Sequence, residues 1–240
     1  MSSCRVIDLG LIGYAQALEL QNRVVRARKA GVISDVLMFC EHPHVITLGR
    51  NGQRANLLAS ERVLRQKGVA YFETSRGGDI TYHGPGQIVG YPILNLGAIK
   101  RDVVWYVRQL EEVMIRASGA WGIVARREES KTGVWAGQGS QAEKLGAIGV
   151  HISRWVTSHG FAYNVSTDLR YFDLIVPCGI AERKATSLEK LLERQVSLVE
   201  ANEALAKHFG EVFGLEMKMA SRPELLAELQ EAERAVAVPA

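Results

Sequence analysis

The sequence predicts a single domain of the α/β (α+β) class, with a mostly β centre flanked by helices. Three observations lead to this prediction. A helix-forming segment lies near the start of the chain, strand-forming segments follow one another from Gly122 to Val165, and the final third turns helical. We find no convincing linker before about residue 215. We therefore expect residues 1–215 to form one domain and residues 216–240 to form a C-terminal helical tail.

Helix and strand signals alternate in the first part of the chain. Residues 14–31 are expected to form a helix that Gly31 closes, and residues 55–68 a second helix. Strands are expected at 35–40, 44–49 and 69–74.

The segment from Arg76 to Leu96, "RGGDITYHGPGQIVGYPILNL", has a different composition. Glycines and prolines interrupt β-forming residues, which indicates strands that bend sharply around something. The segment is neither a phosphate loop nor a dinucleotide-binding fingerprint, because it lacks the spacing of both. It offers backbone N–H groups and the side chains of Arg76, Tyr82 and His83, which fits a ligand-binding wall and a set of tight turns equally well.

The rest of the chain supplies the β centre and the later helices. Asp102 is the expected N-cap of a helix at 102–119. Its buried face is expected to carry Val103, Val107, Leu110 and Met114. Strands are expected at 122–126, 131–137, 144–153 and 156–166. Ser197 and Glu200 have capping-box spacing at the start of a helix at 197–214, and a surface helix is expected in the tail.

Composition predicts a soluble cytoplasmic protein. The chain has 240 residues, of which 47% are hydrophobic, so it can bury a substantial core. Its 3 cysteines are far apart and form no Cys-x-x-Cys, which indicates free thiols in a reducing compartment. We see neither a secretory signal nor an apolar run of the roughly 20 residues that a membrane span needs.

The charge of the chain is mildly basic. A net charge of +3 is well short of a nucleic-acid-binding footprint, so neither a nucleic acid nor a membrane is expected as a partner. Arg23, Arg26, Arg28 and Lys29 fall on the first expected helix. A solvated helix face is the favoured interpretation, and a docking patch for an acidic partner is the alternative.

Cysteine and lysine residues are candidates for chemistry. Cys178 stands between Pro177 and Gly179, where a turn presents a nucleophile or a kinked strand buries a small apolar side chain. For an isolated cysteine the buried alternative is favoured. Lys144 heads an apolar, glycine-bearing strand. It is either a solvated lysine or a partly desolvated amine that acts as a base and favours a nearby thiolate.

The histidines suggest no metal site. His42 and His44 can share one face of a strand, but no third ligand has convincing spacing, so we expect no metal. His83 and His159 each precede a glycine, and each suits a pocket wall or a structural hydrogen bond.

Four motifs together resemble the lipoyl(octanoyl) transferases, the octanoyl-[acyl-carrier-protein]:protein N-octanoyltransferases. They are "RGGDITYHGPGQIVGYPILNL", "KLGAIGV", "TSHGFAYNV" and "LIVPCGI", and the resemblance runs from about Cys4 to about Phe213. Family members often have Lys-Ile-Ala or Lys-Val-Ala where this chain has Lys144-Leu145-Gly146. They often have Ala-Leu-Asn where it has Ala162-Tyr163-Asn164, so the two differences concern the shape of the pocket.

The resemblance implies an acyltransferase of lipoate biosynthesis with the catalytic fold of the lipoate and biotin protein ligases, here in residues 1–215. It implies an acyl thioester on Cys178 with Lys144 as acid/base partner, and no cofactor. The implied substrate-binding residues are Arg76, Gly77, Gly78, Asp79, Ile80, Thr81, Tyr82, His83, Ala147, Ile148, Gly149, Gly160, Phe161 and Ala162. The implied donor is octanoyl-acyl carrier protein. The implied acceptors are lipoyl domains of 2-oxoacid dehydrogenases and the glycine cleavage H protein.

Two alternatives remain at this stage. An ATP-dependent lipoate-protein ligase needs no cysteine, so the Pro-Cys-Gly motif argues against it. A non-catalytic module that binds acyl carriers or lipoyl domains would be marked by loss of Cys178 or Lys144, and both are present.

Overall fold

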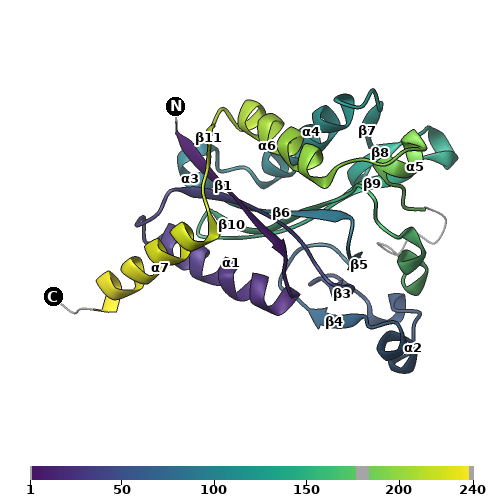
Figure 1. The fold of residues 1–240 in the computed structure, drawn as a ribbon, viewed down its shortest axis with the longest axis horizontal. Helices are drawn as coiled ribbons and strands as arrows, with labels where there is room; N and C mark the ends of the chain where they lie inside the picture. Colours follow the sequence, from purple (N-terminus) through teal and green to yellow (C-terminus); the bar gives the residue numbers. More distant parts are fainter. Residues whose placement is uncertain (1, 177–183, 238–240) are drawn as a thin grey trace.

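A mixed β-sheet is the centre of the computed structural model, which describes residues 2–176 and 184–237 (Figure 1). Within these residues the sheet has eight strands in the spatial order β11-β1-β2-β6-β10-β9-β8-β7. The strands are β1 (Ser3–Leu11), β2 (Asp35–Glu41), β6 (Gln87–Ile93), β7 (Ala125–Glu128), β8 (Lys131–Ala136), β9 (Glu143–Ser153), β10 (Val156–Asn164) and β11 (Glu216–Met219). β1 runs parallel to β11 and β2, and the other neighbours are antiparallel.

Helices cover both faces of this sheet (Figure 1). On one face lie α4 (Val103–Gly119) and α6 (Leu198–Phe213), whose buried residues join one apolar core. On the other face lie α1 (Tyr14–Lys29) and α7 (Arg222–Ala237), which form a second core. The shorter helical segments are η1 (Arg54–Asn56), α2 (Glu61–Gln66), α3 (Leu96–Ile99), η2 (Gly139–Gln141), η3 (Leu169–Leu174) and α5 (Leu188–Leu192). The predicted α/β class, with a β centre between helices, is confirmed.

A small second sheet stands beside the large one. Its order is β4-β3-β5, with β4 (Ala70–Glu73), β3 (Val45–Leu48) and β5 (Ile80–His83). The neighbouring α2 begins at Glu61, later than predicted, because the Ser60 side chain caps it by accepting from the Val63 N–H. Residues Arg54–Asn56 form a separate 3₁₀ turn.

The α4 helix buries only part of the predicted face. Its Asp102 side chain accepts from the Trp105 N–H, as expected of an N-cap. Leu110 and Met114 are buried, but Val103 is 46% exposed and Val107 is only partly buried. Val103 and Val107 therefore lie outside the fully buried core, and both line a cavity described below.

The C-terminal segment begins with a strand that the sequence did not predict. β11 pairs in parallel with β1, which also lacked a local signal. In α7, Leu225 and Leu229 are 0% exposed and belong to the second core. The division into a 1–215 domain and a 216–240 tail stays a prediction. The tail helix packs against the second core through these leucines.

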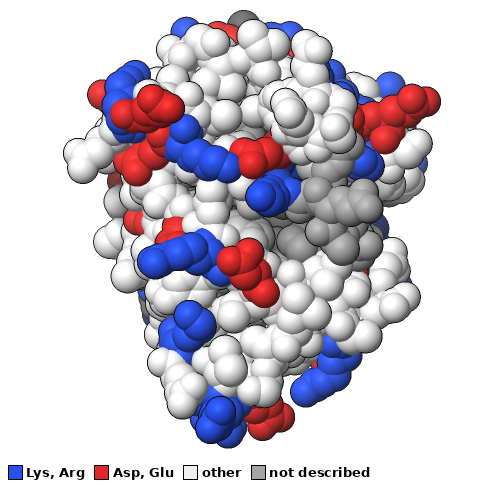
Figure 2. All heavy atoms as spheres, turned by 90° about the vertical axis from the view of Figure 1, so that its right-hand side faces the viewer, with Lys and Arg blue, Asp and Glu red and all other residues white. Residues whose placement is uncertain are grey.

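The charged surface is mixed. On the face shown in Figure 2, basic and acidic side chains lie interspersed. On α1, Arg23 pairs with Glu233 at 2.8 Å and Arg28 pairs with Asp35 at 2.6 Å. These two guanidinium groups are thus held by carboxylates of α7 and β2, and both interpretations of this helix face stay predictions. Among the helices that the structure describes, none is long and apolar enough to cross a membrane.

Candidate active site

A cavity of about 680 Å³ lies where the two sheets meet. Lys144 lines it, and so do all the predicted substrate-binding residues except Tyr82. Tyr82 is fully buried in the core of the small sheet, where its hydroxyl is 2.7 Å from His44 Nδ1. Three segments far apart in the sequence, around Arg76, Lys144 and Phe161, are thus brought to one place.

The loop of Arg76 to Asp79 is clamped between two strands. The Arg76 guanidinium is buried and donates to the Thr47 carbonyl oxygen at 2.6 Å and to the Gly77 carbonyl oxygen at 3.1 Å. The Gly77 N–H donates to the Val150 carbonyl oxygen at 2.8 Å. β3 therefore holds the guanidinium, and β9 holds the loop backbone.

Gly149 makes this close approach possible. A Cβ atom at Gly149 would lie 2.9 Å from Arg76 Cδ and 2.9 Å from the Gly77 carbonyl oxygen. Any larger residue would push the loop off β9, so the "AIGV" motif needs glycine for packing.

Buried polar side chains in the cavity lining are linked to one another by hydrogen bonds. The Gln87 amide nitrogen donates to the Tyr82 carbonyl oxygen at 3.2 Å and to Asn164 Oδ1 at 2.8 Å. Its oxygen is therefore the acceptor toward His83 Nδ1 at 2.7 Å, which places the His83 proton on Nδ1. Asn164 Nδ2 donates onward to the Thr186 carbonyl oxygen at 2.9 Å.

The buried histidines of the cavity are neutral. Burial first, and then the neighbouring His42, lower the pKa of His83 to about 3. Burial first, and then Arg76, lower the pKa of His159 to about 4. His159 Nε2 is 3.2 Å from Ser75 Oγ, and the His159 N–H donates to Gln21 Oε1 at 3.0 Å.

Lys144 is the second residue of β9 and lies over an aromatic ring. Its Nζ is 4.7 Å from the ring centroid of Trp135, a cation–π contact. Its backbone pairs with the returning chain, since the Lys144 N–H donates to the Lys184 carbonyl oxygen and the Thr186 N–H donates to the Lys144 carbonyl oxygen, both at 2.9 Å.

Cys178 lies outside the residues that the structure describes, but the chain on both sides of segment 177–183 is described. The chain before it is anchored where the Val176 N–H donates to the Asn56 carbonyl oxygen at 2.7 Å. Phe172 on one side, and Lys184 and Ala185 on the other, line the same cavity as Lys144. Both flanks of residues 177–183 therefore border this cavity.

Cys4 and Cys40 are unsuited to catalysis. Both are buried free thiols, and burial raises the pKa of each well above its ordinary value. A thiol in this state is a poor nucleophile, because the thiolate is the reactive form.

The His-x-His pair does not converge on one point. His42 is buried, with Nδ1 2.7 Å from the Ile12 carbonyl oxygen and Nε2 2.7 Å from the Tyr91 hydroxyl. His44 contacts Tyr82 instead. Among residues 2–176 and 184–237 no group of three or more His, Cys, Asp or Glu side chains is arranged to hold a metal ion.

Several residues of the site escaped the sequence analysis. Trp135, Gln87 and Tyr91 line the cavity. Gln87 directly follows the "HGPG" segment, but nothing local indicates that it faces Asn164. That pairing comes from the register of β6 and β10, in which Asn164 is opposite Gln87.

The cavity lining combines apolar and polar side chains. Val89, Val107, Ile148 and Phe161 are among the apolar ones, and Lys144 contributes an amine. Such an arrangement suits an acyl chain whose reacting carbonyl carbon lies near the lysine.

The sequence comparisons agree with this chemistry. The lipoyl protein ligase A/B catalytic domain family matches residues 13–210. An octanoyltransferase of Solibacter usitatus is 54% identical over 217 residues, which are 90% of this chain and 96% of the relative. An octanoyltransferase of Acidobacterium capsulatum is 50% identical over 236 residues, with 93% of this chain and 96% of the relative covered.

Solved structures share the fold at low sequence identity. A lipoate-protein ligase A bound with ATP gives a TM-score of 0.77 at 16% identity, covering 98% of this chain and 94% of the ligase. A bipartite lipoate protein ligase from Thermoplasma acidophilum gives 0.76 at 18% identity, with coverages of 98% and 92%. A biotin protein ligase from Aquifex aeolicus gives 0.50 at 12% identity, with coverages of 98% and 77%.

Proposed function

The chain belongs to the octanoyltransferases of the lipoyl protein ligase A/B catalytic domain family, and we propose that it transfers the octanoyl group through a thioester on Cys178, with Lys144 as the acid/base partner. Octanoyl transfer in lipoate biosynthesis is thus its activity. The proposal concerns the groups that perform it.

One observation carries the proposal. Lys144 lines a single cavity together with the Arg76 loop and the Phe161 strand, and both flanks of the segment that contains Cys178 border that cavity. This supports a pairing of Cys178 with Lys144, because residues on both sides of segment 177–183 line the cavity that Lys144 also lines.

The first half-reaction acylates the cysteine. The Cys178 thiolate attacks the thioester carbonyl carbon of octanoyl-acyl carrier protein, a new C–S bond forms, and the C–S bond to the carrier breaks. The Lys144 ammonium stabilises the thiolate before attack and gives its proton to the departing carrier thiolate. The products are acyl-Cys178, a carrier thiol and a neutral Lys144 amine.

The second half-reaction forms the amide. The neutral amine of the acceptor lysine attacks the acyl-Cys178 carbonyl carbon, a C–N bond forms, and the C–S bond breaks. Lys144 takes the proton that the nitrogen must lose, which restores the thiolate and the ammonium. Because a free lysine has a pKa of about 10.4, only about 0.04% of it is neutral at pH 7, so a nearby base is needed.

The predicted substrate-binding residues divide into two groups in this proposal. Ile148, Phe161 and their neighbours hold the acyl chain, which offers roughly 5 kcal/mol of binding at about 0.8 kcal/mol per methylene. The Arg76 loop and Gly149 form the wall beside the reacting carbonyl. Tyr82 supports this wall from the core of the small sheet, because its side chain lies outside the cavity lining.

The partners follow from the reaction. We propose octanoyl-acyl carrier protein as donor, and as acceptors the lipoyl domains of 2-oxoacid dehydrogenases and the glycine cleavage H protein. The structure of the related Thermoplasma ligase was described together with its E2 lipoyl domain, which supports an acceptor of this type. The cytoplasmic location stays a prediction from cysteine usage.

Half-reaction kinetics of two variants at Lys144 test the proposal. Lys144→Ala should slow both half-reactions. Lys144→Arg restores the cation but not the base, so acylation of Cys178 should recover more than release to the acceptor amine. Equal recovery of both steps, or no loss in Lys144→Ala, would contradict the assigned role.

A nucleotide requirement separates transferase from ligase. The donor thioester is already activated, so transfer from octanoyl-acyl carrier protein should proceed at the same rate with and without ATP and magnesium. Activity seen only with free octanoate plus ATP would instead assign the chain to the ligase type.

A further inference from the structure

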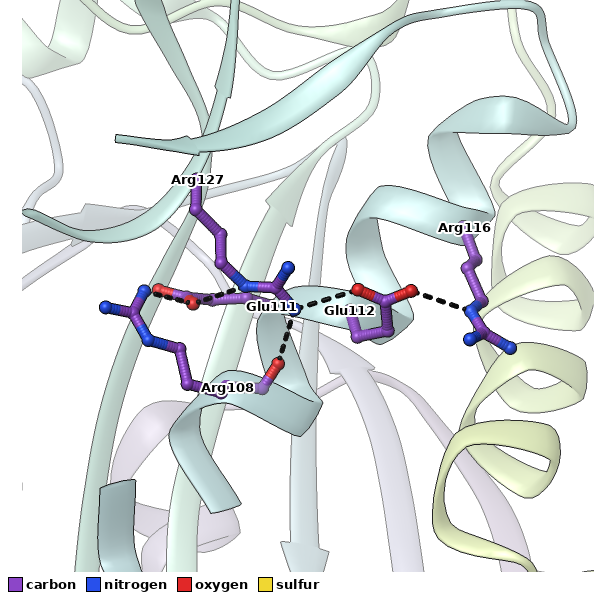
Figure 3. Close-up of polar contacts among 5 residues, drawn as sticks. All are labelled: Arg108, Glu111, Glu112, Arg116 and Arg127. Atoms are coloured by element: carbon purple, nitrogen blue, oxygen red, sulfur yellow. Dashed lines mark hydrogen bonds and ion pairs between the residues drawn. The ribbon is translucent and has the colours of Figure 1, made fainter. Parts of the chain in front are cut away.

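Glu111 is a buried carboxylate of α4 that lies beside the site. Its side chain is 0% exposed and accepts from Arg108 Nη1 at 2.8 Å and from Arg127 Nε at 3.1 Å (Figure 3). Arg127 also bonds Glu112 at 2.8 Å and the Arg108 carbonyl oxygen at 2.9 Å. A buried carboxylate is stable only when it is paired, and the two guanidinium groups supply that pairing.

A third bond links this carboxylate to β8. The Gly133 N–H donates to Glu111 Oε1 at 3.0 Å. Gly133 has φ of +119°, a backbone conformation that glycine adopts without strain. A Cβ atom there would lie 2.6 Å from the Gly146 carbonyl oxygen, so Glu111 bonds β8 at a point where its backbone lies close against that of β9.

This approach coincides with a bulge that places Lys144. Val134 pairs with Gly146, but the next residue, Trp135, pairs with Lys144, so β9 contains one additional residue at this point. Lys144 Cε would lie 3.4 Å from a Cβ atom on Gly133, and Lys144 Nζ lies over the Trp135 ring. The lysine side chain therefore runs past Gly133 and ends against Trp135.

The same helix also holds the other strand of the bulge. A Cβ atom on Gly146 would lie 2.6 Å from Met114 Sδ, so α4 packs directly onto the β9 backbone. Met114 is three residues after Glu111 and so lies on a neighbouring part of the same helix face. α4 thus fixes β8 through Glu111 and β9 through Met114.

We propose that Glu111 is a positioning residue for Lys144, acting through the Gly133 N–H and the β8–β9 bulge. This inference rests on the proposed pairing of Lys144 with Cys178. Loss of the Glu111 acceptor frees the β8 backbone, moves the Trp135 ring and displaces the Lys144 amine from the reacting atoms.

Variants at one position separate the hydrogen bond from the charge. Glu111→Leu removes the acceptor at similar size, and the partly exposed Arg108 and Arg127 can turn to water. Glu111→Gln retains an oxygen that accepts from Gly133. Glu112→Gln is the matched control, because Glu112 pairs with Arg127 and Arg116 on the more exposed side of the helix (Figure 3).

Each variant is measured in three ways. Thermal unfolding measures the stability of the fold. The rates of Cys178 acylation and of octanoyl release to a lipoyl domain are measured separately and report the chemistry. Iodoacetamide alkylation of Cys178 as a function of pH reports the effect of the cation beside the thiol. A purely structural role would change only the first measurement.

Glu111→Leu should lower kcat about 10-fold or more, with KM for the lipoyl domain unchanged, since misplacement of a reacting group by 1 Å costs up to about 100-fold. Its alkylation profile should move to higher pH. Glu111→Gln should stay within about 3-fold of the parent, because it keeps a neutral acceptor. Glu112→Gln should match the parent.

Several outcomes would overturn the proposal. A folded Glu111→Leu with parental kcat and parental alkylation would do so, and so would equal losses in Glu111→Leu and Glu111→Gln. If Glu111→Leu does not fold, Trp135→Leu tests the same geometry, and a folded Trp135→Leu with parental kcat overturns it. Transfer by Cys178→Ser would instead refute the proposed function, which keeps the two failures distinct.

Discussion

Acidification should destabilise the fold through His83. Its pKa is about 3 in the folded protein, against about 6.5 in an unfolded chain. Between these values the unfolded chain binds a proton that the folded chain does not bind, so the free energy of unfolding falls as the pH drops below 6.5. For this one group the loss between pH 7.5 and pH 5 is about 2 kcal/mol.

Urea unfolding of wild type and His83→Asn at pH 7.5, 6.5, 5.5 and 5.0 measures this contribution. Both proteins contain His42 and His159, so the difference between their pH dependences isolates His83. The wild type should lose about 2 kcal/mol more than His83→Asn over this range. Parallel pH dependences would refute a neutral, buried His83 whose Nδ1 proton is held by Gln87.

Two further predictions concern the tail and the acyl slot. Leu229→Ala should lower the free energy of unfolding, measured by urea titration, by about 2–5 kcal/mol. The control Val199→Ala, at a 65% exposed site, should change it by less than about 0.5 kcal/mol. Equal effects of the two substitutions would contradict the packing of α7. Ile148→Phe should narrow the slot and lower the octanoyl-to-hexanoyl ratio of kcat/KM about 10-fold, at about 0.8 kcal/mol per methylene. An unchanged ratio would exclude Ile148 from the chain-binding wall.

Local signals were sufficient for several parts of the fold. Asp102 and Ser197 both cap the helices predicted after them, because an N-cap needs only a side-chain oxygen and the next N–H groups. The glycines and polar side chains of the Arg76 loop fitted a ligand-binding wall and tight turns equally well, and only the family resemblance implied substrate contacts there; the loop lines the cavity.

Features that depend on distant pairing could not be predicted. β11 pairs with β1, which lies at the opposite end of the chain, and β1 also pairs with β2. The closeness of Gln87 and Asn164 depends on strand register, and Glu111 meets Gly133 only because α4 crosses β8. These contacts require the tertiary structure.

For Tyr82, the alternation of side chains along a strand was a signal in the sequence. On a strand, alternate residues face opposite sides, so Tyr82 had to face away from Thr81 and His83. The structure places Thr81 and His83 at the cavity and Tyr82 in the core of the small sheet. Period-2 alternation distinguishes Tyr82 from Thr81 and His83, although Ile80, on the same side of the strand as Tyr82, also lines the cavity.

The central claim is the acyl thioester on Cys178, and its direct test is an intact mass measurement. The protein is incubated with octanoyl-acyl carrier protein without ATP, weighed, digested and mapped. We predict one added octanoyl group on Cys178 and none on the buried Cys4 or Cys40, with the mass returning to that of the free enzyme as a lipoyl domain gains the octanoyl group on its lysine. Octanoyl transfer with no acyl group on the enzyme, or with the group on a residue other than Cys178, would contradict the account.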